Sequence, residues 1–412
     1  MKLLCVVGLG CTVLLTITLC PAPIRAQGKA LTIDDAVTAA LTHSALVQEI
    51  EATFVRQKAE AFETRTLANP EFGTELAVPS SFEHSRGRNE ITVNLVQPVK
   101  LTHGTVRNRL ATLIDMAGSS ERERALLELA ARVRIAFART WVLSERRNAF
   151  ATLIPRAQAL DRFVTAGLRV GAYGKGEDAL FRAEVFKAEA ELKGLTAESI
   201  AGLSELSRVS GYSFADTSLA APTLPVVPAA DQLKVRFERS ETKVQERSKI
   251  LLDLARAAKE VARGDAYPEF RPRIFFSRSN DGVDLVGLGV SFDLPFWSRN
   301  TADRMRADAT FATARANHLL IDTENFKISI LETARSYSIR REEILLYQQH
   351  ILPLVRRALE ATELQVRSGT GSIFQLWQTL REYADANQHY LELWTKAFTA
   401  HVELSVLLGE EI

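Results

Sequence analysis

One long stretch with almost no helix breakers decides the fold of this 412-residue chain. Residues 105–168 read TVRNRLATLIDMAGSSERERALLELAARVRIAFARTWVLSERRNAFATLIPRAQALDRFVTAGL. The stretch holds one proline, Pro155, and outside its last two turns one glycine, Gly118. Apolar residues recur in it at helical spacing, at Leu126, Leu127, Leu129, Ala130, Val133 and Phe137. This pattern predicts a single helix, which at 1.5 Å per residue is about 100 Å long.

The second half of the chain contains a stretch of the same kind. Residues 302–368 hold Pro353 as their only proline and contain no glycine. Each long stretch is followed by a Gly-x-Gly turn and then by a shorter helical stretch. The turns are Gly174–Gly176 and Gly369–Gly371, and the predicted return helices cover residues 177–209 and 372–408. We therefore expect two helical hairpins, each with a long first arm.

A shorter entry helix is predicted in each half, over residues 31–67 and 229–265. Thr32 and Asp35 have the spacing of a capping box, which indicates that the first helix starts there. We interpret Asp34 and Asp35 as first-turn acids that suit the helix dipole, rather than as a catalytic pair of carboxylates. An entry helix and a return helix laid end to end also span about 100 Å. One long helix can therefore lie beside two shorter ones, which predicts a rod.

Three short motifs recur at nearly one offset. Asn69-Pro70-Glu71-Phe72 matches Tyr267-Pro268-Glu269-Phe270 after 198 residues, and Val96-Gln97-Pro98-Val99 matches Asp293-Leu294-Pro295-Phe296 after 197 residues. Gly174-Lys175-Gly176 matches Gly369-Thr370-Gly371 after 195 residues. Motifs that recur in order at a fixed spacing indicate an internal repeat. We predict a first repeat over residues 27–228 and a second over residues 229–412.

Each repeat also carries two short strands before its long helix. The predicted strands cover residues 72–79 and 90–97 in the first hairpin (72–97), and 269–278 and 284–293 in the second (269–293). In the last strand, Leu288, Val290 and Phe292 alternate with Gly287, Gly289 and Ser291. Transmembrane β-strands need about 9–11 residues, which fits these lengths. Taken alone, the strands favour an antiparallel sheet in a soluble protein, because a single barrel strand is a weak signal.

The first 26 residues have the features of a secretory signal peptide. Lys2 supplies the positive end, residues 3–20 are apolar apart from threonines, and Ala26 closes a suitable cleavage site. All three cysteines, Cys5, Cys11 and Cys20, lie in this segment, so the mature protein would have no disulfide or thiol site. Two alternatives stay open: the apolar run remains as a membrane anchor, or Cys20 is a lipidated first residue.

Composition and motifs argue against other classes of function. Lys plus Arg number 51 and Asp plus Glu number 50, so the chain lacks the basic excess of a nucleic-acid binder. The seven histidines are isolated, and neither His-Glu-x-x-His nor Gly-x-Ser-x-Gly occurs. His84 and His103, which flank the first strands, are candidates for contact with an exported metal, although polar loop histidines are the simpler interpretation. We predict no catalytic residue, no cofactor site and no resident metal site, and hence no enzyme.

Taken together, the mature chain resembles the TolC family of outer-membrane efflux channels. The resemblance lies in the opening Leu31-Thr32-Ile33-Asp34-Asp35-Ala36-Val37, in Asn69-Pro70-Glu71-Phe72, in Gln97-Pro98, and in Leu294-Pro295-Phe296-Trp297-Ser298-Arg299-Asn300. The segments around Arg169-Val170-Gly171 and Val366-Arg367-Ser368-Gly369 are similar to the family's helix-turn-helix tips. The order and spacing of these motifs carry the resemblance.

The resemblance implies a mainly helical protein with a small membrane β-barrel. Three copies would each give four strands to one 12-stranded barrel, and their long antiparallel coiled-coil helices would form a periplasmic tube. The implied partners are a homotrimer, outer-membrane lipid, a periplasmic adaptor protein and an inner-membrane efflux pump of the RND type. By the same analogy the adaptor docks on the tips, at Gly174, Gly176, Gly369 and Gly371. The periplasmic constriction would involve Gln365, Arg367, Gln375 and Gln378.

Residues 97–109 are similar to the heavy-metal (CzcC-like) branch of this family, which implies metal cations as substrates. The segment departs from that pattern, because Lys100 replaces an acid and Thr102-His103-Gly104 replaces a tight pair of glycines. The exported substrate, metal or drug, is therefore left open. The alternative function is an exported coiled-coil protein that acts as a periplasmic adaptor or interaction partner.

Overall fold

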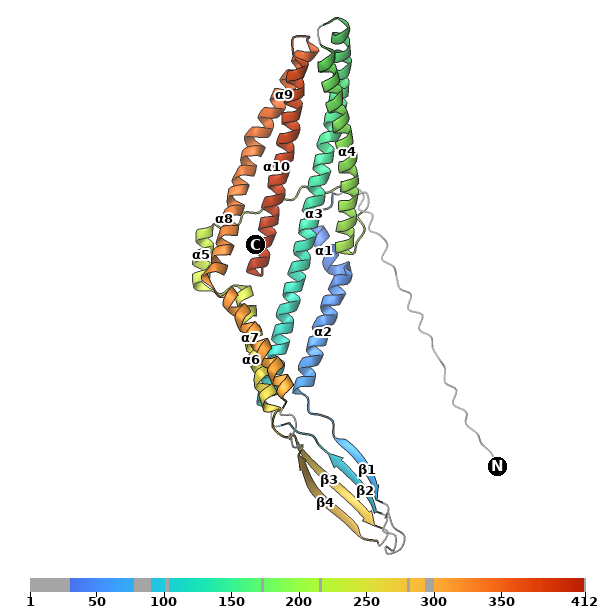
Figure 1. Cartoon of the computed structure of the whole chain (residues 1–412), viewed down its shortest axis with the longest axis vertical. Coiled ribbons are helices and arrows are strands. Elements are labelled where there is room, and N and C mark those ends of the chain that lie inside the picture. The colour runs from blue at the N-terminus through green and yellow to red at the C-terminus, as the bar shows by residue number, and fades with distance from the viewer. Residues whose placement is uncertain are drawn as a thin grey trace, which may run out of the picture.

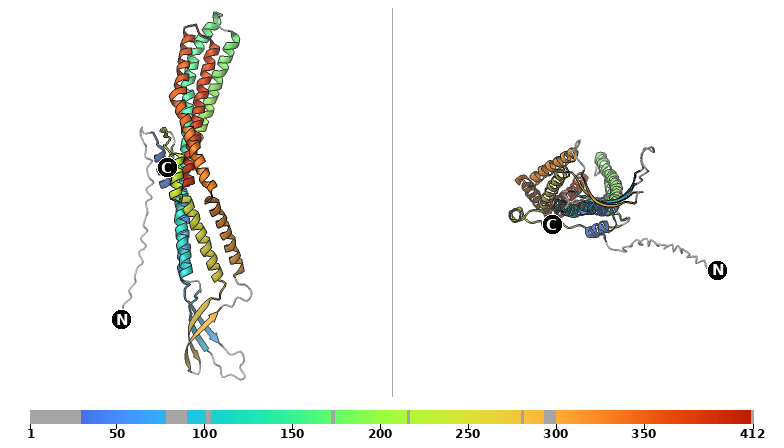
Figure 2. Two further views of the ribbon diagram at one scale, coloured as in Figure 1. Left: turned by 90° about the vertical axis from the view of Figure 1, so that its left-hand side faces the viewer. Right: turned by 90° about the horizontal axis from the view of Figure 1, so that it is seen from below.

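The computed structural model is a rod with a small sheet at one end and the tips of two helical hairpins at the other (Figure 1). It describes residues 30–77, 90–100, 104–171, 174–214, 217–279, 282–292 and 300–410. The predicted signal peptide, with Cys5, Cys11 and Cys20, lies outside the described residues, as do His84 and His103. In a view turned by 90°, the sheet continues the line of the helices (Figure 2).

Helix α3 spans most of the length of the rod and confirms the prediction of one helix over residues 105–168. It runs unbroken from Thr105 to Arg169 and passes through Pro155. Helix α2 (Ala45–Arg65) lies beside its lower half, and α4 (Lys175–Ser210) beside its upper half (Figure 1). One long helix therefore packs against two shorter ones stacked along it, as the lengths predicted.

The second long helix is interrupted, so the prediction of one helix over residues 302–368 is wrong. The stretch divides into α7 (Thr301–Ile321), α8 (Glu324–Leu346), a π-helical turn η1 (Tyr347–Ile351) and α9 (Leu352–Arg367). At the first break Thr323 has extended dihedral angles and its hydroxyl donates to the carbonyl of Leu320 at 2.7 Å. The π-helical turn ends at Ile351, two residues before Pro353, whose nitrogen has no hydrogen to give to an α-helical bond.

The two entry helices are also divided. Ser44 separates α1 (Ile33–His43) from α2, because its hydroxyl caps α2 by accepting from the N–H of Leu46. In the second half α5 (Ala230–Arg239) and α6 (Lys243–Gly264) are separate, and Thr242 with Gln245 forms a capping box at the start of α6. The capping box predicted at Thr32 and Asp35 is confirmed. The predictions of single helices over residues 31–67 and 229–265 are therefore wrong.

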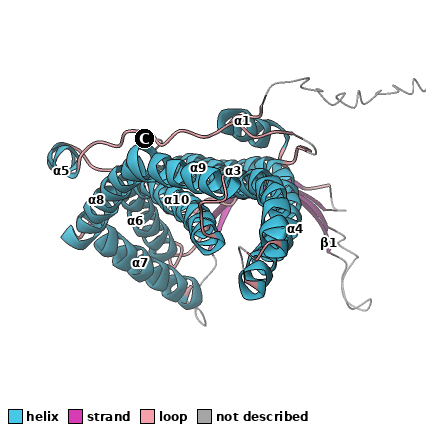
Figure 3. Ribbon diagram, turned by 90° about the horizontal axis from the view of Figure 1, so that it is seen from above, coloured by secondary structure: helices cyan, strands magenta, loops and turns pink. Residues whose placement is uncertain are grey.

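The main hydrophobic core lies halfway along the rod, where α3, α8 and α10 (Ile373–Leu408) meet. Its centre is aromatic: the rings of Trp141 and Trp394 lie 4.7 Å apart, and Trp394 stacks on Phe398 at 5.1 Å. Helices α1 and α5 lie at the periphery of the bundle when it is seen from above (Figure 3). Leu31 and Leu219 form a parallel β-bridge that ties the start of the described chain to the segment joining the two halves.

Tyr337 fastens that joining segment to the core, and its loss is expected to weaken the middle of the rod. Its side chain is buried, and its hydroxyl donates to the carbonyl of Pro225 at 2.5 Å. Burial raises the pKa of Tyr337 to about 12. Tyr337→Phe removes this part-buried hydrogen bond and is expected to lower the free energy of unfolding by about 0.5–1.5 kcal/mol. Denaturant unfolding of the purified protein measures this change.

A matched control is Tyr390→Phe, since Tyr390 is half-buried in the same region and no hydrogen bond of its hydroxyl is present among the described residues. It should change the free energy of unfolding far less. Equal losses in the two variants would contradict the role given to the Tyr337 hydroxyl.

The four strands form one antiparallel sheet in the order β1-β2-β3-β4. Their bounds are β1 Glu71–Ala77, β2 Glu90–Val96, β3 Phe270–Ser279 and β4 Asp284–Phe292. The predicted strands match these, although residues 78, 79 and 293 lie outside the described part. Among the described residues, no helix has the length and apolar character required to cross a membrane.

Candidate channel wall and docking tips

The sheet has one apolar and one polar face. Residues that pair across the four strands share a face, and the row Phe72, Leu95, Ile274 and Leu288 belongs to the apolar one. These side chains are exposed in the single chain, Leu288 by 83%. The next row, Gly73, Asn94, Phe275 and Gly287, belongs to the other face. The predicted grouping of Leu288, Val290 and Phe292 opposite Gly287, Gly289 and Ser291 is confirmed.

Two glycines of β4 make room on the polar face for long side chains of β3. A Cβ atom at Gly287 would lie 2.2 Å from the ring of Phe275, and one at Gly289 would lie 2.7 Å from Nε of Arg273. Phe275 and Arg273 therefore lie flat across β4, with the guanidinium 5.2 Å from the ring centroid. Side chains on the polar face therefore project little from the sheet, which suits the inner wall of a passage.

An ion pair holds the junction between the sheet and the helices. Arg107 donates to both carboxylate oxygens of Asp265, at 2.9 and 2.6 Å, and Lys100 lies 3.9 Å from the same carboxylate. Lys100 and Arg107 belong to the segment that is similar to the heavy-metal branch. The structure thus gives these basic residues a structural role at the base of α3. Among the described residues, no group of three His, Cys, Asp or Glu side chains is placed to hold a metal.

The two tips share one backbone geometry, at glycines other than those aligned from the sequence. Gly171 and Gly369 each have a φ of +76°, and each follows the last turn of a long helical arm. Their N–H groups donate to the carbonyls of Leu168 and Val366. Such left-handed caps favour glycine. Gly369 therefore corresponds to Gly171, 198 residues earlier, and the predicted equivalence with Gly174 is wrong.

The four predicted docking glycines differ in their surroundings. Gly174 caps α4 with a φ of −81°, and its N–H donates to the carboxylate of Glu177 at 3.0 Å. Gly176 lies in the first turn of α4 and has open space where a side chain would go. A Cβ atom at Gly371 would lie 2.8 Å from the backbone of Gln365 and Val366. Gly176 is therefore free to meet a partner, whereas Gly371 is required for the turn itself.

The candidate constriction residues lie together on the hairpin of α9 and α10. Gln365, Arg367, Gln375 and Gln378 are all exposed in the single chain, while Val366 and Leu376 between them are buried. Sequence reasoning missed a neighbouring aromatic group: Phe374 packs on Trp377, and Arg381 lies over the Trp377 ring. Their spacing of three and four residues marks one face of a helix, which was the available signal.

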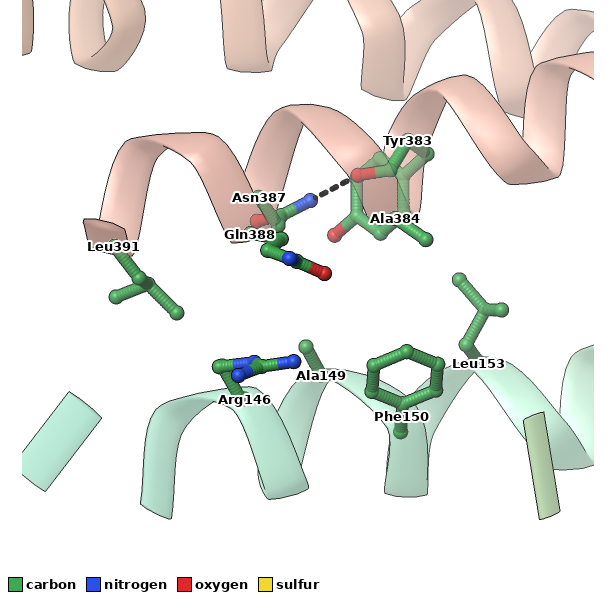
Figure 4. Close-up of a pocket in the computed structure, with 9 residues that line it drawn as sticks. All are labelled: Arg146, Ala149, Phe150, Leu153, Tyr383, Ala384, Asn387, Gln388 and Leu391. Atoms are coloured by element: carbon green, nitrogen blue, oxygen red, sulfur yellow. Dashed lines mark hydrogen bonds between the residues drawn. The ribbon is translucent and has the colours of Figure 1, made fainter. Parts of the chain in front are cut away.

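A small cavity separates the core of the tips from the core at mid-rod. Arg146, Phe150 and Leu153 of α3 face Tyr383 and Gln388 of α10 across it (Figure 4). It is partly open to solvent and has a volume of about 20 Å³, room for about one water molecule. The π-helical turn contacts α10 next to it, where the ring of Tyr347 lies 5.3 Å from that of His389. The two hairpins therefore leave a small gap between them at this level.

Residues 247–410 match the sequence model of a family described as "Outer membrane efflux protein". This region is less than half of the chain. No curated protein sequence matches the chain. The matched family supports the prediction that the protein is not an enzyme.

Solved structures of outer membrane channels share the fold over most of the chain. The outer membrane protein VceC of Vibrio cholerae aligns with a TM-score of 0.73 and 15% identity, over 92% of this chain and 96% of that one. The CmeC outer membrane channel of Campylobacter jejuni aligns with a TM-score of 0.74 and 14% identity, over 92% and 85%. The open state of the MtrE channel of Neisseria gonorrhoeae aligns with a TM-score of 0.70 and 13% identity, over 92% of this chain and 89% of that one. This chain therefore has the fold of these outer membrane channels, and its C-terminal part carries the sequence pattern of outer membrane efflux proteins.

Proposed function

We propose that this protein is an outer membrane efflux channel that works as a homotrimer and reaches into the periplasm. The observation that carries the proposal is the two-faced sheet at the end of a long helical rod. An exposed apolar face suits contact with lipid, and a polar face built over glycines suits an aqueous passage. The match to outer membrane efflux proteins and the shared channel fold support it.

The need for further copies follows from surfaces that one chain leaves uncovered. Within the described ranges, strands β1 and β4 form the two edges of the sheet and have no strand beyond them, and within a bilayer such backbone groups require partners. Helix α7 has no buried residue at all, and Met305 and Leu320 on it are 68% and 69% exposed. Three copies would satisfy both needs: their strands would close a 12-stranded barrel, and α7 would pack against a neighbouring copy. A soluble adaptor would gain nothing from such a sheet.

The partners follow from the placement of the tips. They lie at the opposite end of the rod from the sheet (Figure 1), where an adaptor that bridges to an inner-membrane pump would meet the channel. The exposed Gly176 and the Phe374–Trp377 pair offer it a flat backbone surface and an aromatic anchor. The passage of metal cations rests only on the resemblance of residues 97–109, so drugs are equally open as substrates. Export assays across metals and drugs in a strain that lacks the protein decide between them.

The first test of the proposal is the location and assembly of the protein. Membrane fractionation followed by gels of boiled and unboiled samples should place it in the outer membrane, as a trimer that dissociates on heating. A monomer in the soluble periplasmic fraction would contradict the proposal.

The constriction is proposed to lie at Gln365, Arg367, Gln375 and Gln378. Three copies of Arg367 around the axis would narrow the passage and repel one another unless paired. Arg367→Ala is therefore expected to raise the single-channel conductance in planar bilayers several-fold. Arg356→Ala, at an exposed arginine about 16 Å further from the tip along α9, is the control. Equal conductance in both variants would remove Arg367 from the constriction.

A further inference from the structure

We infer the register in which β4 of one copy pairs with β1 of the next: Ser291 opposite Ala77, and Phe292 opposite Leu76. This inference rests on the trimeric channel proposed above. It goes beyond that proposal because it names the residue pairs at the seam between copies.

The first step is that the two hairpins have the same internal register. In the first hairpin Phe72 pairs with Leu95. The motif offsets in the sequence are 198 residues for β1 to β3 and 197 residues for β2 to β4. These offsets convert Phe72 and Leu95 into Phe270 and Phe292, and that is the pair present in the second hairpin. The offsets therefore relate paired residues of the first hairpin to paired residues of the second, and not only similar motifs.

The second step uses the seam that the chain already contains. Strands β2 and β3 join the two hairpins, with Asn94 paired to Phe275 and Leu95 to Ile274. The same offsets convert the β2 residue Asn94 into Ser291 and the β3 residue Phe275 into Ala77. They convert Leu95 and Ile274 into Phe292 and Leu76. A seam between copies that repeats the internal seam therefore has the register stated above.

A second copy is the partner that fits these edges. The sheet ends with β1 on one side and β4 on the other, which are the counterparts of the β3 and β2 edges that meet internally. Ser291 and Ala77 both lie on the polar face, so the pairing continues each face without a flip. Within one chain Ala77 lies in the row of Glu90 and Ser279, at one end of the sheet, and Ser291 lies beside Arg271 at the other end. The two residues are also three strands apart, so they are far beyond disulfide reach within one chain.

The geometry of the internal seam also shows which pairs suit a chemical cross-link. Val99 and Phe270 exchange both backbone hydrogen bonds, at 2.8 and 3.0 Å, and the N–H of Gln97 donates to the carbonyl of Pro272 at 3.0 Å. Because hydrogen-bonded and non-hydrogen-bonded pairs alternate, Asn94 and Phe275 form a non-hydrogen-bonded pair, in which side chains are closer. Ser291 and Ala77 inherit that position, with Cα atoms about 4.5 Å apart, within the range of disulfides.

The test is oxidative cross-linking of the full chain in outer membranes. All three native cysteines lie in residues 1–20, within the predicted signal peptide. Once that peptide is removed, the introduced cysteines have no native thiol to compete with them. A chain with both Ser291→Cys and Ala77→Cys should give covalent trimer on a denaturing, non-reducing gel, and reductant should return it to monomer. Each single variant should give none.

The matched control combines Ser291→Cys with Glu75→Cys, which is two residues further along the same polar face. Diagonal positions of this kind are about 7–8 Å apart, so the control should cross-link at least about tenfold less, since disulfides need Cβ atoms near 4 Å. Cross-linking of the control pair instead of the Ala77 pair would overturn the register and leave the trimer standing. An unboiled trimer in which neither pair cross-links would also overturn it. Loss of every oligomeric form in the native protein would overturn the proposed channel itself.

Discussion

Val290→Arg is expected to remove most of the folded trimer from the outer membrane. Val290 lies on the apolar face of β4 and is 53% exposed in the single chain. An arginine that faces lipid near the middle of the bilayer costs about 2–4 kcal/mol per copy, and a trimer bears that cost three times. The yield of trimer in unboiled gels of outer membranes measures the effect.

The controls for this variant lie on the polar face. Thr92→Arg is the best matched, since Thr92 pairs with Glu75 and Ser277 and an added cation there finds an acid as its neighbour. Ser291→Arg should give an intermediate yield, because Ser291 lies directly opposite Arg271 and like charges that face each other across strands are unfavourable. Equal trimer yields for Val290→Arg and Thr92→Arg would mean that the faces of the sheet are wrongly assigned.

The strand faces could be predicted because a period of two leaves little choice. A shift of one residue would have placed Gly287, Gly289 and Ser291 on the apolar face. Only the observed register puts most of the large apolar side chains of β4 on the same face as most of those of the other strands. The length of α3 could also be predicted, since Pro155 is the only strong breaker between Gly118 and its last turns. These features depend on patterns that extend over many residues.

The helix breaks at Ser44, Thr242 and Thr323 could not be predicted with the same ease. Each depends on one short polar side chain that caps or bonds back to the backbone, and such residues are also common inside helices. Pro155 and Pro353 occupy equivalent places, yet α3 continues through the first and a π-helical turn precedes the second. The residue type alone therefore does not predict whether a helix continues through a proline.

The tips show how a letter pattern can mislead. Gly-x-Gly occurs at 174–176 and at 369–371, and it invited an alignment at an offset of 195 residues. The physical requirement is a single glycine with positive φ after the last helical turn, and Gly171 and Gly369 meet it. Their offset of 198 residues equals that of β1 to β3 and is within one residue of that of β2 to β4. Conformation, rather than the repeated letters, therefore identifies the equivalent residues.

Gly176→Trp is expected to abolish efflux while the trimer in the outer membrane stays at its normal level. Gly176 is exposed in the first turn of α4, and in the described part of the chain no atom lies within 4 Å of the position that its Cβ would take. An indole there starts from open space and points away from the packed core, but it prevents close approach by an adaptor. The sheet lies about 100 Å away along α3, so its assembly should be unaffected. Unboiled gels measure the trimer, and cross-linking to the adaptor measures docking.

Two other glycines make the interpretation of this variant secure. Gly194→Trp, about 27 Å further along α4, is the matched control, because Gly194 is also exposed with open space around it. It should keep both docking and efflux. Gly371→Trp is unsuitable as a docking probe, since its side chain would meet the backbone of Gln365 and Val366 and disturb the turn. Full adaptor capture by Gly176→Trp would place docking elsewhere, whereas a loss of trimer would mean that the tips take part in assembly. Only loss of capture at Gly176 with normal trimer, beside an unaffected Gly194→Trp, assigns the open first turn of α4 to the adaptor.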